Sequence, residues 1–392
     1  MQPLCLNSQL KFIFRWTHLM GLWIPERQSR RRVPTPWETF TLAYTAFAFF
    51  SVMSIVLGAV RDLSRVLELS VPIVVSLMYL LMMAKTVYIW LGKSKLLALM
   101  DAMDDAIAFA PFAQHQKVVV DFICGNVRKT VLGLISLGTA VYVATLVAFY
   151  FFSFLPTEFK EDQVVAGFKA KNWTLLENVG FGLHCILTLI MPTKMLLMDT
   201  LMIQCHYFVV QQLKLLNRIY NQPCSFNEKK KFCFNCGKES DCDYFDNWVR
   251  MFNKVKRIHV EVNKFFGPYC IIYVGCVMFL LCIITFTAAK FPSSLLATAM
   301  ALVAVLFIIQ IFAFCKSGQS VRDAAERLTD TICTGPRCNL RLAEGLNYLV
   351  ALDLQRSFTV RGGPFFNVNL EFFASIIGVV FTYFVVLVQI KE

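Results

Sequence analysis

The sequence has few charged residues and none of the short motifs that mark common enzyme classes. Charged residues make up 16% of the 392-residue chain, whereas soluble domains carry roughly 25%. There is no glycine-rich phosphate loop, no H-E-x-x-H and no G-x-S-x-G. We therefore expect no enzyme and no cofactor. The first 24 residues contain Lys11 and Arg15 and lack a clean apolar core, so we expect no cleaved signal peptide.

Apolar residues are abundant: 57% of the chain is hydrophobic, and 37 residues are phenylalanine. This composition predicts a polytopic membrane protein. Its backbone must be helical where single stretches cross lipid, because their polar groups have to pair internally. The net charge of +12 is explained by cytosolic loops rich in Lys and Arg, so we expect no nucleic-acid partner.

Seven apolar stretches reach the ~20 residues that a transmembrane helix needs. The expected spans are 38–60, 66–91, 130–155, 176–205, 265–289, 294–315 and 365–391. Pro192 interrupts the fourth. Between the spans we expect helical extensions at 92–129 and a flexible basic loop at 207–264. The chain then divides into a cytosolic tail (1–37), six spans with their cytosolic extensions (38–331), a cytosolic collar helix (332–363) and a terminal helix (364–392).

The distribution of positive charge predicts the orientation. With a cytosolic N-terminus, 29 of the 38 Lys and Arg residues fall in inside segments and 7 in outside segments. Inside loops of membrane proteins are enriched in these residues. We therefore expect the N-terminus in the cytosol and, after seven crossings, the C-terminus outside.

The loops expected outside contain no cysteine and one glycosylation acceptor. All 14 cysteines lie in spans or in expected cytosolic segments, so we expect no extracellular disulfide. Asn172, in Asn-Trp-Thr, is the candidate glycosylation site. Four cysteines of the long basic segment are irregularly spaced, at Cys224, Cys233, Cys236 and Cys242. Zinc sites have cleaner pairs, so we expect no metal.

One stripe of the terminal helix is small and polar. Successive steps of four, three, four, three and four residues place its members on one face. They are Glu371, Ser375, Gly378, Thr382, Val385 and Gln389. Close packing between helices explains such a stripe, because small residues favour it. A water-filled pore lined by several copies of the helix is the alternative explanation.

The end of this helix resembles the closing motif of insect gustatory receptors. Thr382-Tyr383 is followed by five apolar residues, Gln389 and then Ile390, where that family usually has Phe. The resemblance implies a tetramer, of one kind of chain or mixed with related receptors. It would be a ligand-gated cation channel in the plasma membrane of chemosensory neurons, opened by a small-molecule tastant.

The same resemblance implies roles along the helix, which would line the pore. Gln389 would present amides to monovalent and divalent cations near the outer end, and Val385 or Val386 would form an apolar constriction. Glu371 would attract cations at the inner mouth, although a carboxylate at a helix N-terminus is also favourable for the helix itself.

The segment before the terminal helix has leucines at Leu342, Leu346, Leu349 and Leu352. Their spacing predicts an amphipathic helix. It would form a collar with its counterparts beneath the membrane, or lie on the inner lipid surface. Leu354 falls off this stripe.

The ligand is expected in the outer half of the bundle, since a tastant arrives from outside. Polar groups inside membranes are costly and often functional, although aromatic residues there also serve plain packing. The candidates are Tyr142, Phe149, Tyr150, Glu177, His184, Thr285 and Phe286. Lys85, Lys194 and Asp199 lie toward the cytosolic ends, where we expect them to snorkel or pair.

A seven-span metabotropic receptor and a transporter are the alternatives. A G-protein-coupled receptor has its N-terminus outside and usually an outer disulfide, and neither fits here. Many transporters have repeated halves with broken helices, and this sequence shows no internal repeat.

Overall fold

The computed structural model describes 70–109, 175–221, 239–290, 295–334 and 358–391, with isolated helical positions at 133, 136, 350, 353, 354 and 357. The helices are α3 (Ser70–Ile107), α5 (Leu175–Asn221), α6 (Glu239–Lys290), α7 (Leu295–Thr334) and α9 (Leu370–Lys391). A two-residue hairpin, β1 (Arg361–Gly362) and β2 (Phe366–Asn367), precedes α9.

Four of the helices are much longer than a membrane is thick. α3, α5, α6 and α7 have 38, 47, 52 and 40 residues, which at 1.5 Å per residue is about 57 to 78 Å. The hydrocarbon core of a bilayer is only ~30 Å thick. Among the described residues, Asp246–Phe286 and Met300–Thr334 are long and apolar enough to cross it, and Leu370–Val386 is a shorter apolar stretch. A helix of this length that crosses a bilayer must therefore extend well beyond it.

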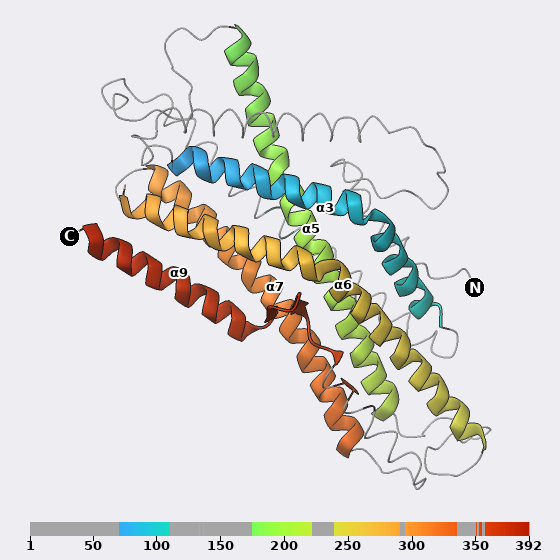
Figure 1. Ribbon diagram of the computed structural model, residues 1–392. Helices are drawn as coiled ribbons and strands as arrows, with labels where there is room; N and C mark the ends of the chain where they lie inside the picture. Colours follow the sequence, from blue (N-terminus) through green and yellow to red (C-terminus); the bar gives the residue numbers. More distant parts are fainter. Residues whose placement is uncertain are drawn as a thin grey trace.

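α6 is the central helix of the described bundle. It packs against α3, α5, α7 and α9, and α5 packs against α7 (Figure 1). α9 lies at the edge of the bundle, where it contacts α6 and α7. One face of α9 is therefore covered by its own chain.

The expectation of a flexible loop at 207–264 is wrong for most of that segment. α5 continues to Asn221 and α6 already begins at Glu239, which leaves 222–238 outside the described residues. The extensions are helical because their apolar residues recur at helical spacing and are buried, as in Leu213 and Leu216 on α5 and Trp248 and Phe252 on α6. The Trp248 indole donates to the Leu216 carbonyl at 3.1 Å and joins the two extensions.

The terminal helix begins later than expected. Residues 364–369 form a turn, a strand and a bend, and α9 starts at Leu370. The turn uses Gly363 in the left-handed region, with φ 57°, a conformation that glycine adopts without steric cost. Asn369 then caps the helix, since its Oδ1 accepts from the Phe372 N–H at 2.9 Å.

At the described positions of the expected collar segment, apolar residues are buried. Leu354 is fully buried together with Val350 and Phe358, and these three follow steps of four. The four leucines of the expected stripe lie outside the described residues.

Helix α5 runs through Pro192 without a break, contrary to the expected interruption. Spans one and three, and Asn172, lie outside the described residues, apart from Gly133 and Ser136 in span three.

Candidate functional site

The small and polar stripe of α9 is exposed on the single chain. Glu371, Ser375, Gly378, Thr382 and Gln389 are all exposed. Ile376 and Val380 are buried on the covered side of the helix, at 2% and 7% exposure. Val386 is 45% exposed and Val385 is half-buried. The face left open by α6 and α7 is therefore the face on which the sequence places the candidate pore residues.

The polar side chains of this stripe bond mainly to the helix itself. The Ser375 hydroxyl donates to the Glu371 carbonyl at 3.0 Å, and the Thr382 hydroxyl donates to the Gly378 carbonyl at 2.8 Å. Such bonds let a hydroxyl sit on an apolar helix while its oxygen lone pairs stay available. Tyr383, in the closing motif, is 40% exposed.

Glu371 sits in the first turn of α9. One of its carboxylate oxygens accepts from the Asn369 amide at 3.2 Å, and the side chain remains exposed. A carboxylate in this position stabilises the helix N-terminus. The geometry fits this role and leaves the charge accessible to a cation.

The hairpin before α9 is held closely against α7 and α6. A Cβ atom added at Gly318 of α7 would lie 2.2 Å from the Val368 carbonyl oxygen, so only glycine fits there. The Val368 N–H in turn donates to the Val360 carbonyl at 2.8 Å. On α6, the Asn263 amide donates to the Thr359 carbonyl at 2.9 Å. The base of α9 is thus attached to the extended halves of two long helices.

His259 and Lys256 add to this attachment from α6. The His259 ring is stacked on Phe358 with centroids 5.1 Å apart, and its Nε2 lies 3.2 Å from the Thr359 carbonyl. His259 precedes the expected fifth span, and burial lowers its pKa to about 4. The Lys256 ammonium pairs with Asp353 at 2.6 Å. The segment leading into α9 is therefore joined to α6 by stacking, hydrogen bonds and charge.

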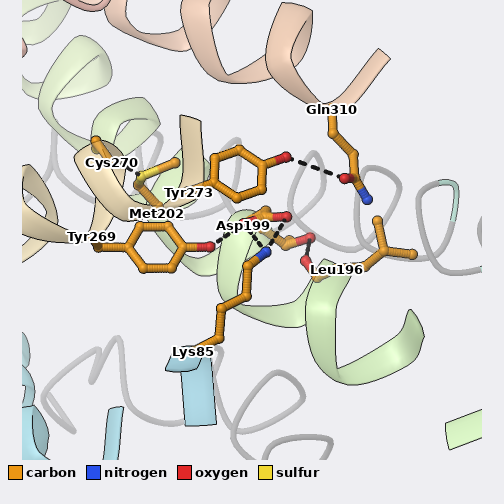
Figure 2. A network of polar contacts seen from close by, with 9 residues as sticks. Lys85, Leu196, Asp199, Met202, Tyr269, Cys270, Tyr273 and Gln310 are labelled. Atoms are coloured by element: carbon orange, nitrogen blue, oxygen red, sulfur yellow. Dashed lines mark hydrogen bonds and ion pairs between the residues drawn. The ribbon is translucent and has the colours of Figure 1, made fainter. Parts of the chain in front are cut away.

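A second polar cluster lies inside the bundle and joins four helices (Figure 2). Lys85 of α3 pairs with Asp199 of α5, with Nζ 2.9 and 3.0 Å from the two carboxylate oxygens. The Tyr269 hydroxyl of α6 donates to the same carboxylate. The Tyr273 hydroxyl donates to the Gln310 amide oxygen of α7 at 3.2 Å, and Lys85 Nζ lies 4.3 Å from the Tyr273 ring centroid. We call these five side chains the four-helix cluster.

The four helices bring these residues to one level of the expected membrane. Lys85 and Asp199 each lie six residues before the inner end of their expected span, and Gln310 lies five before. Tyr269 and Tyr273 follow the inner start of span five by four and eight residues. At 1.5 Å per residue, the cluster lies about 6 to 12 Å inside the inner boundary. Intramembrane charges are costly unless paired, so a functional role is the default hypothesis.

The pairing of Lys85 with Asp199 confirms one of the two expectations for these charges. Both side chains are buried, at 4% and 8% exposure, so they do not snorkel. The Lys194 side chain is not described. Sequence reasoning missed Tyr269, Tyr273 and Gln310, although their positions in the expected spans, at a depth similar to that of Lys85 and Asp199, were a usable signal.

The expected ligand residues are not assembled by the described structure. Tyr142, Phe149 and Tyr150 lie outside the described residues, and the side chains of Glu177 and His184 on α5 are not described. Thr285 and Phe286 are half-buried on α6. The Thr285 hydroxyl lies 2.9 Å from the carbonyls of Leu281 and Cys282 in its own helix. The outer-half ligand site stays a prediction.

Comparison with known families gives a match over most of the chain. The family described as "7tm Odorant receptor" matches residues 65–381. Curated relatives include odorant receptor coreceptors from Ooceraea biroi, at 26% identity over 149 residues, and Aedes aegypti, at 25% over 149 residues. Each alignment covers 37% of this chain and 30% of the relative, so the chain spans about a third of the coreceptor length in these matches.

Solved structures show the same fold. The insect olfactory receptor OR5 from Machilis hrabei, in complex with eugenol, superimposes with a TM-score of 0.75 at 16% identity, covering 98% of this chain and 99% of that one. A second structure of OR5 from Machilis hrabei gives a TM-score of 0.74 at 18% identity. The likeness extends over nearly the whole chain.

Proposed function

Because the chain belongs to the 7tm odorant receptor family of insect chemoreceptors, we propose that it is a subunit of an odorant-gated cation channel in the plasma membrane of chemosensory neurons. The observation that carries this proposal is the open face of α9. This 22-residue apolar helix is covered by its own chain on one side and presents Ser375, Gly378, Thr382 and Gln389 on the other. Exposed hydroxyl and amide groups suit a water-filled axis better than lipid.

In this proposal four copies of α9 surround the pore. Gln389 lies near its outer end, Val385 or Val386 forms the constriction that closes by dewetting, and Glu371 lies at the inner mouth. The buried face of α9 keeps each copy attached to its own α6 and α7. Assembly with a second type of subunit is supported by the similarity to odorant receptor coreceptors.

The proposed ligand is a small volatile molecule bound in the outer half of the bundle. The family is one of odorant receptors, and a structural relative was solved in complex with eugenol. These facts favour an odorant over the tastant that the closing motif implies. A gustatory role would instead be supported if water-soluble sugars or bitter compounds opened the channel and volatiles did not.

The proposed orientation places the N-terminus in the cytosol and the C-terminus outside. The halves of α3, α5, α6 and α7 expected in the cytosol lie toward the same end of the bundle (Figure 1). The contacts there include the Lys254–Asp105 pair at 2.8 Å. Because these ends lie on the same side of the bundle, they support a chain whose successive spans cross the membrane in opposite directions. If antibodies reached a C-terminal tag only after the cells were permeabilised, the proposed extracellular C-terminus would be contradicted.

The test is electrical recording from cells that express the protein alone and with a coreceptor, during exposure to a panel of volatiles. We expect odorant-evoked cation current that persists when G proteins are blocked, because the conduction pathway belongs to the receptor. Gln389→Ala should change the relative permeability to monovalent and divalent cations. Phe381→Leu is the matched control on α9, since Phe381 is exposed but lies off the polar stripe. Current abolished by G-protein block and indifferent to Gln389 would contradict the channel.

A further inference from the structure

A cationic hollow lies between the cytosolic extensions of α5 and α7. Its volume is about 290 Å³, and its lining residues are Lys214, Asn217, Arg218, Ala324 and Arg327. α5 and α7 pack against each other here (Figure 1), and the small Ala324 side chain, 6% exposed, leaves space at the base. We call this feature the α5–α7 cavity.

Among the described residues, the lining of the cavity has three positive charges and an amide but no carboxylate. Lys214 and Arg218 are one helical turn apart on α5, and Arg327 faces the same hollow from α7. Within the described residues none of the three is in an ion pair. The neighbouring acids of α7 are engaged elsewhere: Asp323 accepts from Gln319 at 2.7 Å, and Glu326 accepts from Arg322 at 2.8 Å.

Lys214, Arg218 and Arg327 are all exposed, so solvent partly screens their mutual repulsion, and a bound anion would remove the remainder. Guanidinium groups match the oxygens of phosphate in bidentate geometry, while lysine supplies a point charge. The Asn217 amide adds a neutral donor that a phosphate or sugar hydroxyl can use. Arg218 in the last turn of α5 is also favourable for the helix C-terminus, but Lys214 and Arg327 lie away from their helix ends.

We propose that the α5–α7 cavity is a regulatory site for a small phosphorylated molecule of the cytosol. Ligand pockets commonly measure roughly 300 to 1,000 Å³, so this cavity suits a ligand at the small end of that range, such as a phosphorylated sugar or cyclitol. The proposal is independent of how the channel selects odorants or ions.

Its depth favours a soluble ligand over a lipid headgroup. Along the helix axes at 1.5 Å per residue, Lys214 lies about 14 Å beyond the inner end of the fourth expected span. Arg327 lies about 18 Å beyond the inner end of the sixth. The headgroup layer adds only about 5 to 8 Å on each side of the hydrocarbon core. A phosphoinositide headgroup has the same chemistry, and the experiment separates the two sources.

The test measures binding of inositol 1,4,5-trisphosphate to the purified full-length receptor in detergent micelles by isothermal titration calorimetry. A second arm measures attachment of the receptor in nanodiscs to vesicles that contain phosphatidylinositol 4,5-bisphosphate. We expect saturable binding of the soluble probe that weakens as ionic strength rises. Arg327→Gln with Lys214→Gln should lower the affinity about tenfold or more, because two charged hydrogen bonds are lost.

Arg250→Gln is the matched control, since Arg250 is an exposed arginine on α6 that does not line the cavity. Arg327→Lys should keep part of the affinity by retaining the charge. Size-exclusion profiles of all variants check folding and assembly. The proposal is overturned if millimolar probe does not bind, if R250Q weakens binding as much as the cavity variants, or if only the lipid vesicles bind. The proposal would also be overturned if the cavity variants failed to assemble but still bound the probe normally. That result would show that Lys214 and Arg327 serve contacts between copies of the chain.

Discussion

The Lys85 ammonium and the Asp199 carboxylate lie 114 residues apart in the chain and form a two-point contact of 2.9 and 3.0 Å inside the bundle. Removal of one partner leaves the other charge buried without compensation. We expect Asp199→Asn to destabilise the receptor by about 3–5 kcal/mol. The measurement is the midpoint of thermal unfolding of the detergent-purified protein, followed by fluorescence-detected size exclusion.

The double variant Lys85→Met/Asp199→Leu separates this cause from simple loss of packing. Apolar replacement of both partners is often neutral, so much of the lost stability should return. Glu261→Gln is the control, because the exposed Lys264–Glu261 pair should contribute under about 1 kcal/mol. A double variant as unstable as the single one would contradict the uncompensated charge as the cause.

Tyr269→Phe removes the hydroxyl that donates to Asp199. Hydrogen bonds to charged groups contribute about 1.5–3 kcal/mol, so we expect a loss of that order in the same unfolding measurement. Tyr383→Phe, at an exposed tyrosine of α9, should leave unfolding unchanged. Equal midpoints for Tyr269→Phe and the unsubstituted protein would show that the hydroxyl does not stabilise the cluster.

Two glycines should respond in opposite ways to alanine. Gly318→Ala places a Cβ atom against the Val368 carbonyl. The segment between β2 and α9 must then move, and the start of α9 should lose its contact with α7. We expect reduced surface expression and no current. At Gly378 an added Cβ meets nothing within 4 Å among the described residues, and alanine favours the helix by about 1 kcal/mol.

Gly378→Ala should therefore leave folding of the single chain intact. Any change in single-channel conductance must then arise at the pore axis or at neighbouring copies. Full current from Gly318→Ala would contradict the tight fit between α7 and the hairpin.

Glu371→Gln distinguishes the two roles of this carboxylate. If it only stabilises the helix N-terminus, stability should fall by about 0.3–1 kcal/mol and conductance should be unchanged. If it also attracts cations, conductance at low salt should fall while high salt masks the difference. Asn369→Ala is the control: loss of the cap costs about 1 kcal/mol without changing the charge.

Stability should decrease as the cytosolic pH falls below about 6.5. The pKa of His259 is about 4 in the folded protein because of burial, whereas an exposed histidine titrates near 6.5. The unfolded chain then binds more protons between these values, and the contribution lost by pH 4 is about 3 kcal/mol. His259→Gln should reduce the slope of the unfolding midpoint against pH between pH 6.5 and 4 without abolishing it. An unchanged slope would assign the dependence to other groups.

Sequence periodicity predicted the small and polar stripe of α9. The structure leaves that stripe exposed, because Ile376 and Val380 on the opposite side of the helix are buried where α9 packs against α6 and α7. The positions of Lys85 and Asp199 near the ends of their expected spans predicted that these charges pair or snorkel. Sequence reasoning failed for the basic segment at 207–264, where many lysines suggested a loop while Trp248 and Phe252 supply a buried helical face. It missed the hairpin before α9, since two residues per strand leave no periodic signal.

The sequence alone determined that this chain is a helical membrane protein with a distinctive terminal helix, because composition and spacing reveal which segments are apolar and which face of a helix differs. Only the tertiary structure decided that Lys85 meets Asp199 and Tyr269, that Gly318 receives the Val368 carbonyl, and that Lys214 and Arg327 share one hollow. Local spacing sets the faces of a helix, but the relative rotation and depth of helices far apart in the chain follow from how all those faces pack together.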